Sequence, residues 1–160
     1  MSDKIILTDT SKGDSRTSGG KPSLAEVYEA TKTHQYDVRR VMEFYAKLLK
    51  IKGSVHDWTK TENFNEEYGQ MVTSDIRDED FLKSEWWWRH ITLERHHCKD
   101  YSHIDINLFD ILEMIADRVT AEKGRTGSIN MNYLDLNPTI LIRAYYNTIK
   151  LTDEKTELEK

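Results

Sequence analysis

The sequence has a single cysteine, Cys98, among its 160 residues. One cysteine cannot form an internal disulfide, and a chain without disulfides fits a reducing cytosol. No apolar run approaches the roughly 18–20 residues that a membrane-spanning helix needs, and the first residues lack the pattern of a signal peptide. We therefore expect a cytoplasmic protein that has no membrane partner.

Proline and glycine are also scarce, and basic residues are not in excess. The chain has two prolines and seven glycines, which fits an all-α bundle. Its 23 Lys and Arg residues against 28 Asp and Glu residues give a net charge of −5. Because proteins that bind a nucleic-acid backbone normally carry a basic field, we expect no duplex nucleic acid as a partner.

Capping signals and helical periodicity predict a series of helices. Ser23 to Glu26 forms a capping box that opens a long helix, which we expect to run to about Ile51 and to end at Gly53. Further helices are predicted near 55–58, and over about 81–97, 106–123 and 139–151. No convincing strand is found. We therefore predict an all-α helical bundle of about five to seven helices over residues 23–151, with a flexible tail at 1–22 and a charged tail at 152–160.

Histidines and carboxylates stand out within these predicted helices. Residues 86–98, WWWRHITLERHHC, hold three of the six histidines. Seven residues separate His90 from His97, so on one helix they share a face, whereas His96 points about 100° away. A His-Asp doublet stands at 56–57, and a later helix carries Asp110, Glu113 and Asp117. Bundles build metal sites from such residues on facing helices, and this mixture suits Zn, Mn, Fe, Co or Ni.

The order of these residues resembles the HD-domain metal-dependent phosphohydrolases. The corresponding pieces are His34, VHDWTK (55–60), His90 with one of His96 and His97, and MIAD (114–117). More narrowly, residues 24–150 are similar to a family of small phage and bacterial proteins known only as a domain of unknown function. That likeness rests on His34 with Val38-Arg39, His56-Asp57 with Lys60, Arg95-His96-His97, and Asp110 with Glu113-Met114 and Asp117.

The resemblance implies an HD-type bundle that holds one or two divalent transition-metal ions. The ligands it implies for the first ion are His34, His56, Asp57 and Asp117. For the second ion it implies His90 and His97, where His97 is preferred to His96 because it shares a face with His90. Lys60 is implied near the substrate phosphate or a bridging water. A long acidic insert after the doublet departs from compact HD nucleotidases, so their substrates do not transfer to this chain.

Other side chains are candidates for supporting roles. Arg89 and Arg95 could hold phosphate through charge-assisted hydrogen bonds. Asp110 and Glu113 could each orient ligating histidines, hold a substrate or form a solvated face; we assign Glu113 to the substrate, and Asp110 with His96 to orienting the ligands. Trp86, four residues before His90, is the tryptophan that could stack on a base, with simple packing as its alternative.

The hypothesis that follows is a metal-dependent phosphohydrolase acting on a nucleotide or another small phosphate ester, which could be a nucleotide signal. Metal-activated water would attack, Asp57 would bridge or orient it, and Lys60 with an arginine would stabilise charge on the phosphoryl oxygens. The rivals are an HD-type di-iron oxygenase and a non-catalytic nucleotide or protein binder with a residual metal site. If the chain is phage-encoded, the host cytoplasm is the expected location. The sequence leaves homo-oligomerisation open.

Overall fold

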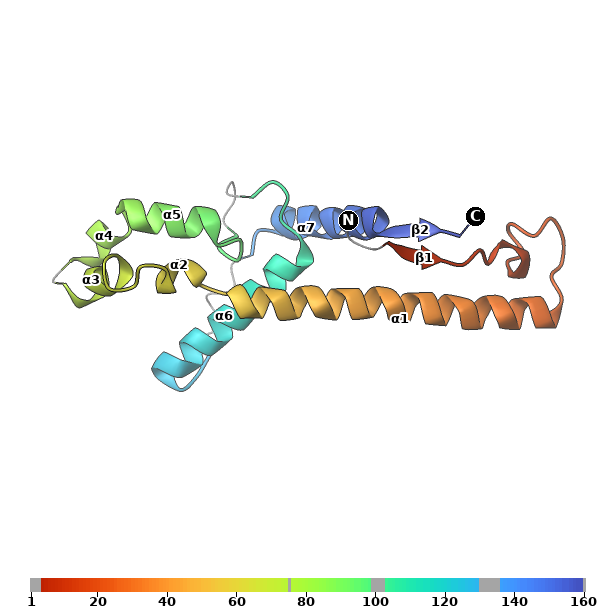
Figure 1. The fold of residues 1–160 in the computed structure, drawn as a ribbon, viewed down its shortest axis with the longest axis horizontal. Helices are drawn as coiled ribbons and strands as arrows, with labels where there is room; N and C mark the ends of the chain where they lie inside the picture. The colour runs from red at the N-terminus through yellow and green to blue at the C-terminus, as the bar shows by residue number, and fades with distance from the viewer. Residues whose placement is uncertain (1–3, 75, 99–102, 130–135, 160) are drawn as a thin grey trace. The chain divides into compact units, whose positions relative to one another are not determined.

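The protein is described from a computed structural model, which defines residues 4–74, 76–98, 103–129 and 136–159. Figure 1 shows the element order, in which the helices are η1 (Ser11–Gly13), α1 (Leu24–Val55), α2 (Trp58–Thr61), α3 (Tyr68–Thr73), α4 (Asp78–Phe81), α5 (Glu85–Leu93), α6 (Leu108–Thr126) and α7 (Pro138–Lys155). Two three-residue strands, β1 (Ile5–Leu7) and β2 (Thr156–Leu158), complete it. Regular structure is therefore almost entirely helical, which confirms the predicted all-α class.

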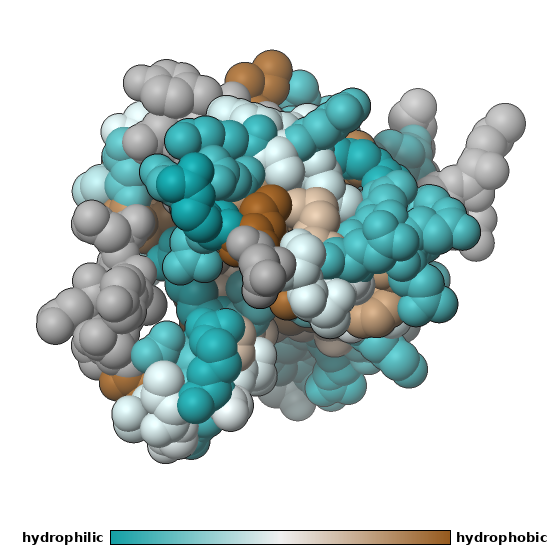
Figure 2. Space-filling view, turned by 90° about the vertical axis from the view of Figure 1, so that its left-hand side faces the viewer, coloured by the Kyte–Doolittle hydropathy of each residue, from teal (hydrophilic) through white to brown (hydrophobic). Residues whose placement is uncertain are grey.

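The described residues form two compact units. Unit 1 comprises residues up to Leu48 together with those from Ile149, and unit 2 comprises Leu49–Thr148. No helix among the described residues is long and apolar enough to cross a membrane. The face drawn in Figure 2 is mainly hydrophilic with small separate hydrophobic areas, as expected for a chain in which charged residues make up 32%.

In unit 1, α1 begins with the predicted capping box. The Ser23 hydroxyl accepts from the backbone N–H of Glu26, and the Glu26 carboxylate accepts from the backbone N–H of Ser23. Within the same unit β1 pairs with β2 in parallel, Ile5 opposite Thr156. The expectation of no strand is therefore wrong for two short segments. Three residues are too few to show the alternation by which a strand is recognised in sequence.

Unit 2 contains the apolar core that supports the helices around the site. Asn107 caps α6 by accepting from the backbone N–H groups of Phe109 and Asp110, and Gly127 ends the helix with a φ of 77°. The core lies where α6 packs with the first turns of α7, and it consists of Cys98, Ile106, Ile111, Met114, Ile140 and Ala144. Each larger apolar side chain buried here contributes about 1.5–3 kcal/mol to folding.

Two helix ends differ from the prediction near the site. The first is α1, which continues through Gly53 to Val55, because a helix tolerates an interior glycine at a cost of about 1 kcal/mol. The second is α5, which ends at Leu93 rather than near His97, so His96 and His97 lie in the turn that follows it. The acidic insert also holds three helices that lack a long periodic pattern, namely α2, α3 and α4.

Candidate metal centre

The backbone changes direction sharply where α1 meets α2. His56 directly follows α1, and Asp57 precedes α2 with φ 56° and ψ 28°, in the left-handed region. Residues other than glycine rarely adopt this conformation, although aspartate tolerates it better than most. Such strained positions gather at functional sites. The turn brings the Asp57 carboxylate up to the three histidines of residues 90–97.

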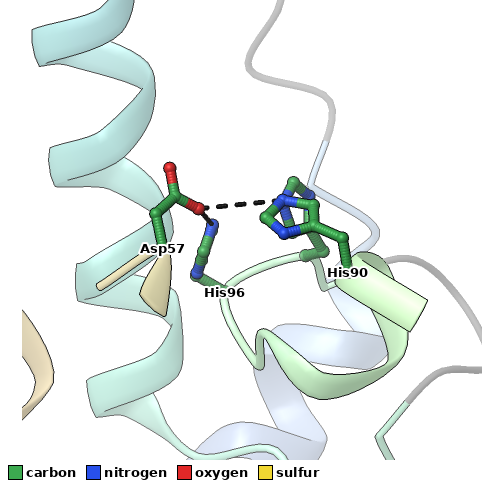
Figure 3. A group of neighbouring side chains, drawn as sticks. Asp57, His90 and His96 are labelled. Atoms are coloured by element: carbon green, nitrogen blue, oxygen red, sulfur yellow. Dashed lines mark hydrogen bonds and ion pairs between the residues drawn. The ribbon is translucent and has the colours of Figure 1, made fainter. Parts of the chain in front are cut away.

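Four side chains meet at this turn, and we call them the four-residue group: Asp57, His90, His96 and His97. One potential ligand atom from each lies within 4.8 Å of the others. Asp57 Oδ1 lies 3.4 Å from His96 Nε2 and 3.7 Å from His90 Nε2, as drawn in Figure 3. The Nε2 atoms of His90 and His97 are 2.8 Å apart. Three imidazoles thus converge on one carboxylate oxygen.

A second group adjoins the first and shares His96 with it. This three-residue group consists of His56, His96 and Asp117. His56 Nε2 lies 3.4 Å from Asp117 Oδ1 and 3.5 Å from Asp57 Oδ2. Asp57 therefore faces the four-residue group through Oδ1 and the residue His56 through Oδ2.

Several polar atoms at the junction are buried without a hydrogen-bond partner. They are Asp57 Oδ1 and both ring nitrogens of His96. Buried polar atoms are normally paired, so such atoms need a physical explanation. Their contacts at 3.4–3.7 Å are longer than ordinary hydrogen bonds. A cation between them would satisfy these atoms, and imidazole with carboxylate is a donor set that divalent transition metals take.

The charges of His96 and of the neighbouring carboxylates depend on one another. Burial lowers the pKa of His96, but the carboxylates of Asp57 and Glu113 outweigh it and raise that pKa to about 9. Burial would raise the pKa of Asp57, yet the nearby His96 ring and the paired Lys60 hold that pKa well below its usual range. Without a metal, His96 is therefore the positive charge between two carboxylates.

The other two imidazoles of the four-residue group stay neutral. Burial, with the charge of Lys60 next in size, lowers the pKa of His90 to about 4. Burial and the neighbouring His96 lower the pKa of His97 to about 3. At neutral pH both rings are therefore uncharged, which is the form in which histidine binds a metal.

Thr59 and Glu94 fix the orientation of His90, and sequence reasoning missed both. The Thr59 hydroxyl and backbone N–H donate to Glu94 Oε1 at 2.8 and 2.9 Å. The hydroxyl oxygen lies 2.6 Å from His90 Nδ1, so it accepts that ring's N–H. This leaves Nε2 as the acceptor nitrogen of His90, 2.8 Å from His97 Nε2 and 3.7 Å from Asp57 Oδ1. A buried threonine has no distinguishing signal in the sequence, and Glu94 was one acid among many.

Glu113 lies beside the Nδ1 atoms of two imidazoles. Its Oε1 is 3.2 Å from His56 Nδ1 and 3.4 Å from His96 Nδ1, and its Oε2 is 3.3 Å from Lys52 Nζ. Burial would raise the pKa of Glu113, but the His96 and His56 rings beside it lower that pKa to about 2. The arrangement is that of an acceptor that orients histidine ligands, one of the alternatives the sequence left open. Lys52 was not predicted.

The remaining supporting residues are engaged elsewhere. Asp110 is fully buried and pairs with Lys52 and Arg95, rather than orienting a histidine. Arg95 also binds Asp105 at 2.9 Å. Ion pairs to Glu62 and Glu67 occupy Arg89. Of the three predicted phosphate partners, Lys60 is the one whose ion pair is with a group member, Asp57.

Trp86 and His34 are not members of either group. Trp86 is 7% exposed, with Tyr68 at 4.9 Å and His90 stacked at 5.0 Å between ring centroids. The ring therefore packs between His90 and Tyr68. Neither group includes His34, which lies on α1 in unit 1. The metal role that the resemblance implies for His34 stays a prediction.

Comparison with known families agrees with the narrow resemblance. Residues 23–157 match a family described as a family of unknown function, DUF5662. The chain belongs to this family. No curated protein and no solved structure matches it. Both groups lie inside the region that defines DUF5662, but the family brings no activity with it.

A cavity opens beside the three-residue group of this DUF5662 protein. Its volume is about 330 Å³. The α1 side is formed by Leu49, Lys52, Gly53 and His56, and the α6 side by Leu112, Glu113, Ala116, Asp117 and Thr120. Since His56 and Asp117 belong to both the wall and the group, the cavity is continuous with the candidate metal centre.

Proposed function

We propose that this protein is a metal-dependent phosphohydrolase of the HD-domain type, acting on a small phosphate ester such as a nucleotide. The observation that carries the proposal is the position of Asp57 between the two groups. Its two oxygens face different imidazoles, and Oδ1 is buried without a hydrogen-bond partner. A carboxylate placed in this way can serve two ions at once, as two-metal hydrolytic sites require.

The ligands for each ion follow from the contacts. Asp57 Oδ2, His56 Nε2 and Asp117 would hold one ion, and Asp57 Oδ1 with the imidazoles of the four-residue group would hold the other. Bound ions would supply a water of lowered pKa and would polarise the phosphoryl group. Hydrolysis then joins the water oxygen to phosphorus, breaks the ester P–O bond and transfers a proton to the departing alcohol.

The chain's own residues prepare this site in three ways. Glu113 orients the rings of His56 and His96 through their Nδ1 atoms. The Thr59–Glu94 pair holds His90 with its Nε2 lone pair inward. Lys60, paired with Asp57, supplies the positive charge that would contact a phosphoryl oxygen. Arg89 and Arg95 pair with acids outside the two groups, whereas Lys60 pairs with Asp57 itself, so Lys60 carries this role in our proposal.

A di-iron oxygenase is the second candidate function, and the number of imidazoles at the site favours it. Four imidazoles, those of His56, His90, His96 and His97, surround Asp57. A nitrogen-rich donor set suits iron as well as manganese or cobalt. Oxygen consumption by the iron-loaded protein in the presence of a substrate, without phosphate release, would favour this candidate over the hydrolase.

The test is phosphate release by protein loaded with Mn²⁺, Co²⁺ or Fe²⁺, over a panel of nucleotides and simple phosphate esters. We expect turnover with at least one metal, and an Asp57→Asn variant should lose at least about 100-fold, more than supporting residues usually cost. Asp78→Asn, at an exposed aspartate on α4, is the matched control and should keep full activity. An absence of release with every metal would contradict the proposal.

A further inference from the structure

The cavity beside the metal centre is built by two helix faces. On α1 the lining residues 49, 52, 53 and 56 follow the spacing of a single face, and on α6 residues 112, 113, 116, 117 and 120 do the same. Its volume of about 330 Å³ is near the lower end of the ~300–1,000 Å³ typical of ligand pockets. The space therefore fits one small organic group and is too small for a dinucleotide.

The cavity wall is apolar away from the metal ligands. Leu49 is 38% exposed and Leu112 is 46% exposed, and both line the cavity together with Ala116. The charged lining residues Lys52 and Glu113 are paired with each other. An apolar group entering the cavity would thus cover exposed apolar surface, which is favourable in water.

Gly53 has no local reason to be a glycine. It lies inside α1, where glycine is less favourable than alanine. Its φ is not positive, and a Cβ atom built on it would meet nothing within 4 Å. By contrast, a Cβ at Gly69 would come within 2.6 Å of a backbone oxygen. What glycine provides at position 53 is room in the wall of the cavity, three residues before His56.

We infer that this cavity receives the apolar organic group of the substrate, whose phosphate lies at the metal centre. The inference rests on the proposed function and narrows its substrate class to a phosphate monoester of a small, largely apolar alcohol or phenol. His56 and Asp117 determine which way the substrate lies, because they line the cavity and also belong to the three-residue group. Gly53 is then the residue that determines how large an organic group can enter.

Binding of two non-hydrolysable probes tests this inference. Calorimetry on the Mn²⁺-loaded protein compares phenylphosphonate with methylphosphonate, which share the phosphonate head and differ in the organic group. We expect phenylphosphonate to bind at least about tenfold more tightly, since even one methylene in an apolar pocket is worth roughly 10–200-fold. Gly53→Leu should abolish this preference by weakening the binding of phenylphosphonate.

Ser54→Leu is the matched control, because it adds the same side chain in the same helical turn at an exposed position that does not line the cavity. This variant should keep the preference for the phenyl group. If Gly53→Leu does not fold, Gly53→Ala decides the question, since it adds only a methyl group and should still reduce the preference. Equal affinity of the wild-type protein for the two probes, or a preference that Gly53 variants leave unchanged, would overturn the inference.

Turnover separates this inference from the proposed function. Hydrolysis of phenyl phosphate and methyl phosphate with equal kcat/KM, unaffected by Gly53→Leu, would support the hydrolase and overturn the role of the cavity. A Gly53-dependent preference for phenylphosphonate without hydrolysis of either ester would uphold the cavity and contradict the hydrolase. The inference and the hydrolase both predict hydrolysis with a Gly53-dependent preference for the phenyl ester.

Discussion

Asp57 presents its two carboxylate oxygens to different imidazoles from a left-handed backbone conformation. The neighbouring residues make this arrangement specific. Lys60 pairs with the carboxylate, and Thr59 on the same short helix holds His90. Asp57, Thr59 and Lys60 therefore all contact or orient members of the four-residue group. The four-residue helix α2, which follows the left-handed residue Asp57, is held by the hydrogen bonds of Thr59 to His90 of α5 and to Glu94 just after α5.

The role of Thr59 can be tested by Thr59→Val, which keeps the shape and removes the hydroxyl. His90 then loses the acceptor for its Nδ1–H, and its inward-facing lone pair is no longer fixed. We expect the Mn²⁺ dissociation constant to rise about 10–100-fold, as for other residues that orient metal ligands. Thr59→Ser should restore binding, and Thr61→Val, at an exposed site on the same helix, should leave it unchanged. Wild-type affinity in Thr59→Val would contradict this role.

Protonation of the histidines predicts how stability depends on pH in metal-free protein. Folded His90 and His97 have pKa values of about 4 and 3, below the ~6.5 of an unfolded histidine. As pH falls below about 6.5 the unfolded chain therefore binds protons that the folded chain does not, and the free energy of unfolding decreases. Folded His96 has a pKa of about 9, so its stabilising contribution is present below about 6.5 and is lost as pH rises through 9.

We thus expect a stability maximum near pH 6.5, measured by urea unfolding in a chelator at pH 4.5, 6.5 and 8.5. His96→Gln should remove most of the decrease between pH 6.5 and 8.5, while the decrease on the acid side remains. A decrease of wild-type size on the alkaline side of His96→Gln would show that another group causes it.

Among the helices, the long ones were predictable and the short ones were not. Periodicity placed α6 and α7 to within a few residues, because each buries one apolar stripe in the core of unit 2. The helices α2, α3 and α4 have four to six residues and are fixed by tertiary contacts, such as the Thr59–Glu94 hydrogen bonds. The end of α5 at Leu93 had no such signal either. It changed how His96 and His97 reach the site.

That last difference altered the candidate site itself. A helix to His97 would have turned His96 away from His90, whereas the turn after Leu93 brings both His96 and His97 to Asp57. The sequence therefore predicted the residue types and most members of the two groups, because the order of motifs is specific. It could not predict the choice between adjacent histidines, since that depends on where one helix ends.

Gly53 and Gly69 make opposite predictions at the level of the helix. Gly53→Ala should raise the free energy of unfolding by about 0.5–1 kcal/mol, because α1 gains helix propensity and the new Cβ meets open space. Gly69→Ala should lower it by about 1–3 kcal/mol, because the Cβ would overlap the Phe64 backbone oxygen. Urea unfolding of both variants measures the difference. Destabilisation by Gly53→Ala would show that the cavity wall has no free space there.

Within the whole molecule, unit 2 contains both groups and the cavity. The DUF5662 region extends further and includes α1 from its start, where His34 lies. Sequence reasoning implied His34 as a ligand through resemblance alone. The metal role of His34 therefore stays a prediction.

Mn²⁺ binding is the measurement that decides whether Asp57 joins two metal sites. Calorimetry on metal-free protein should give two equivalents of Mn²⁺ per chain, and electron paramagnetic resonance should show that the two ions are magnetically coupled. Asp57→Asn should weaken both sites and abolish the coupling, while the control Asp78→Asn should bind as the wild type does. A protein that binds no Mn²⁺, or an Asp57→Asn variant with unchanged stoichiometry, affinity and coupling, would contradict the account.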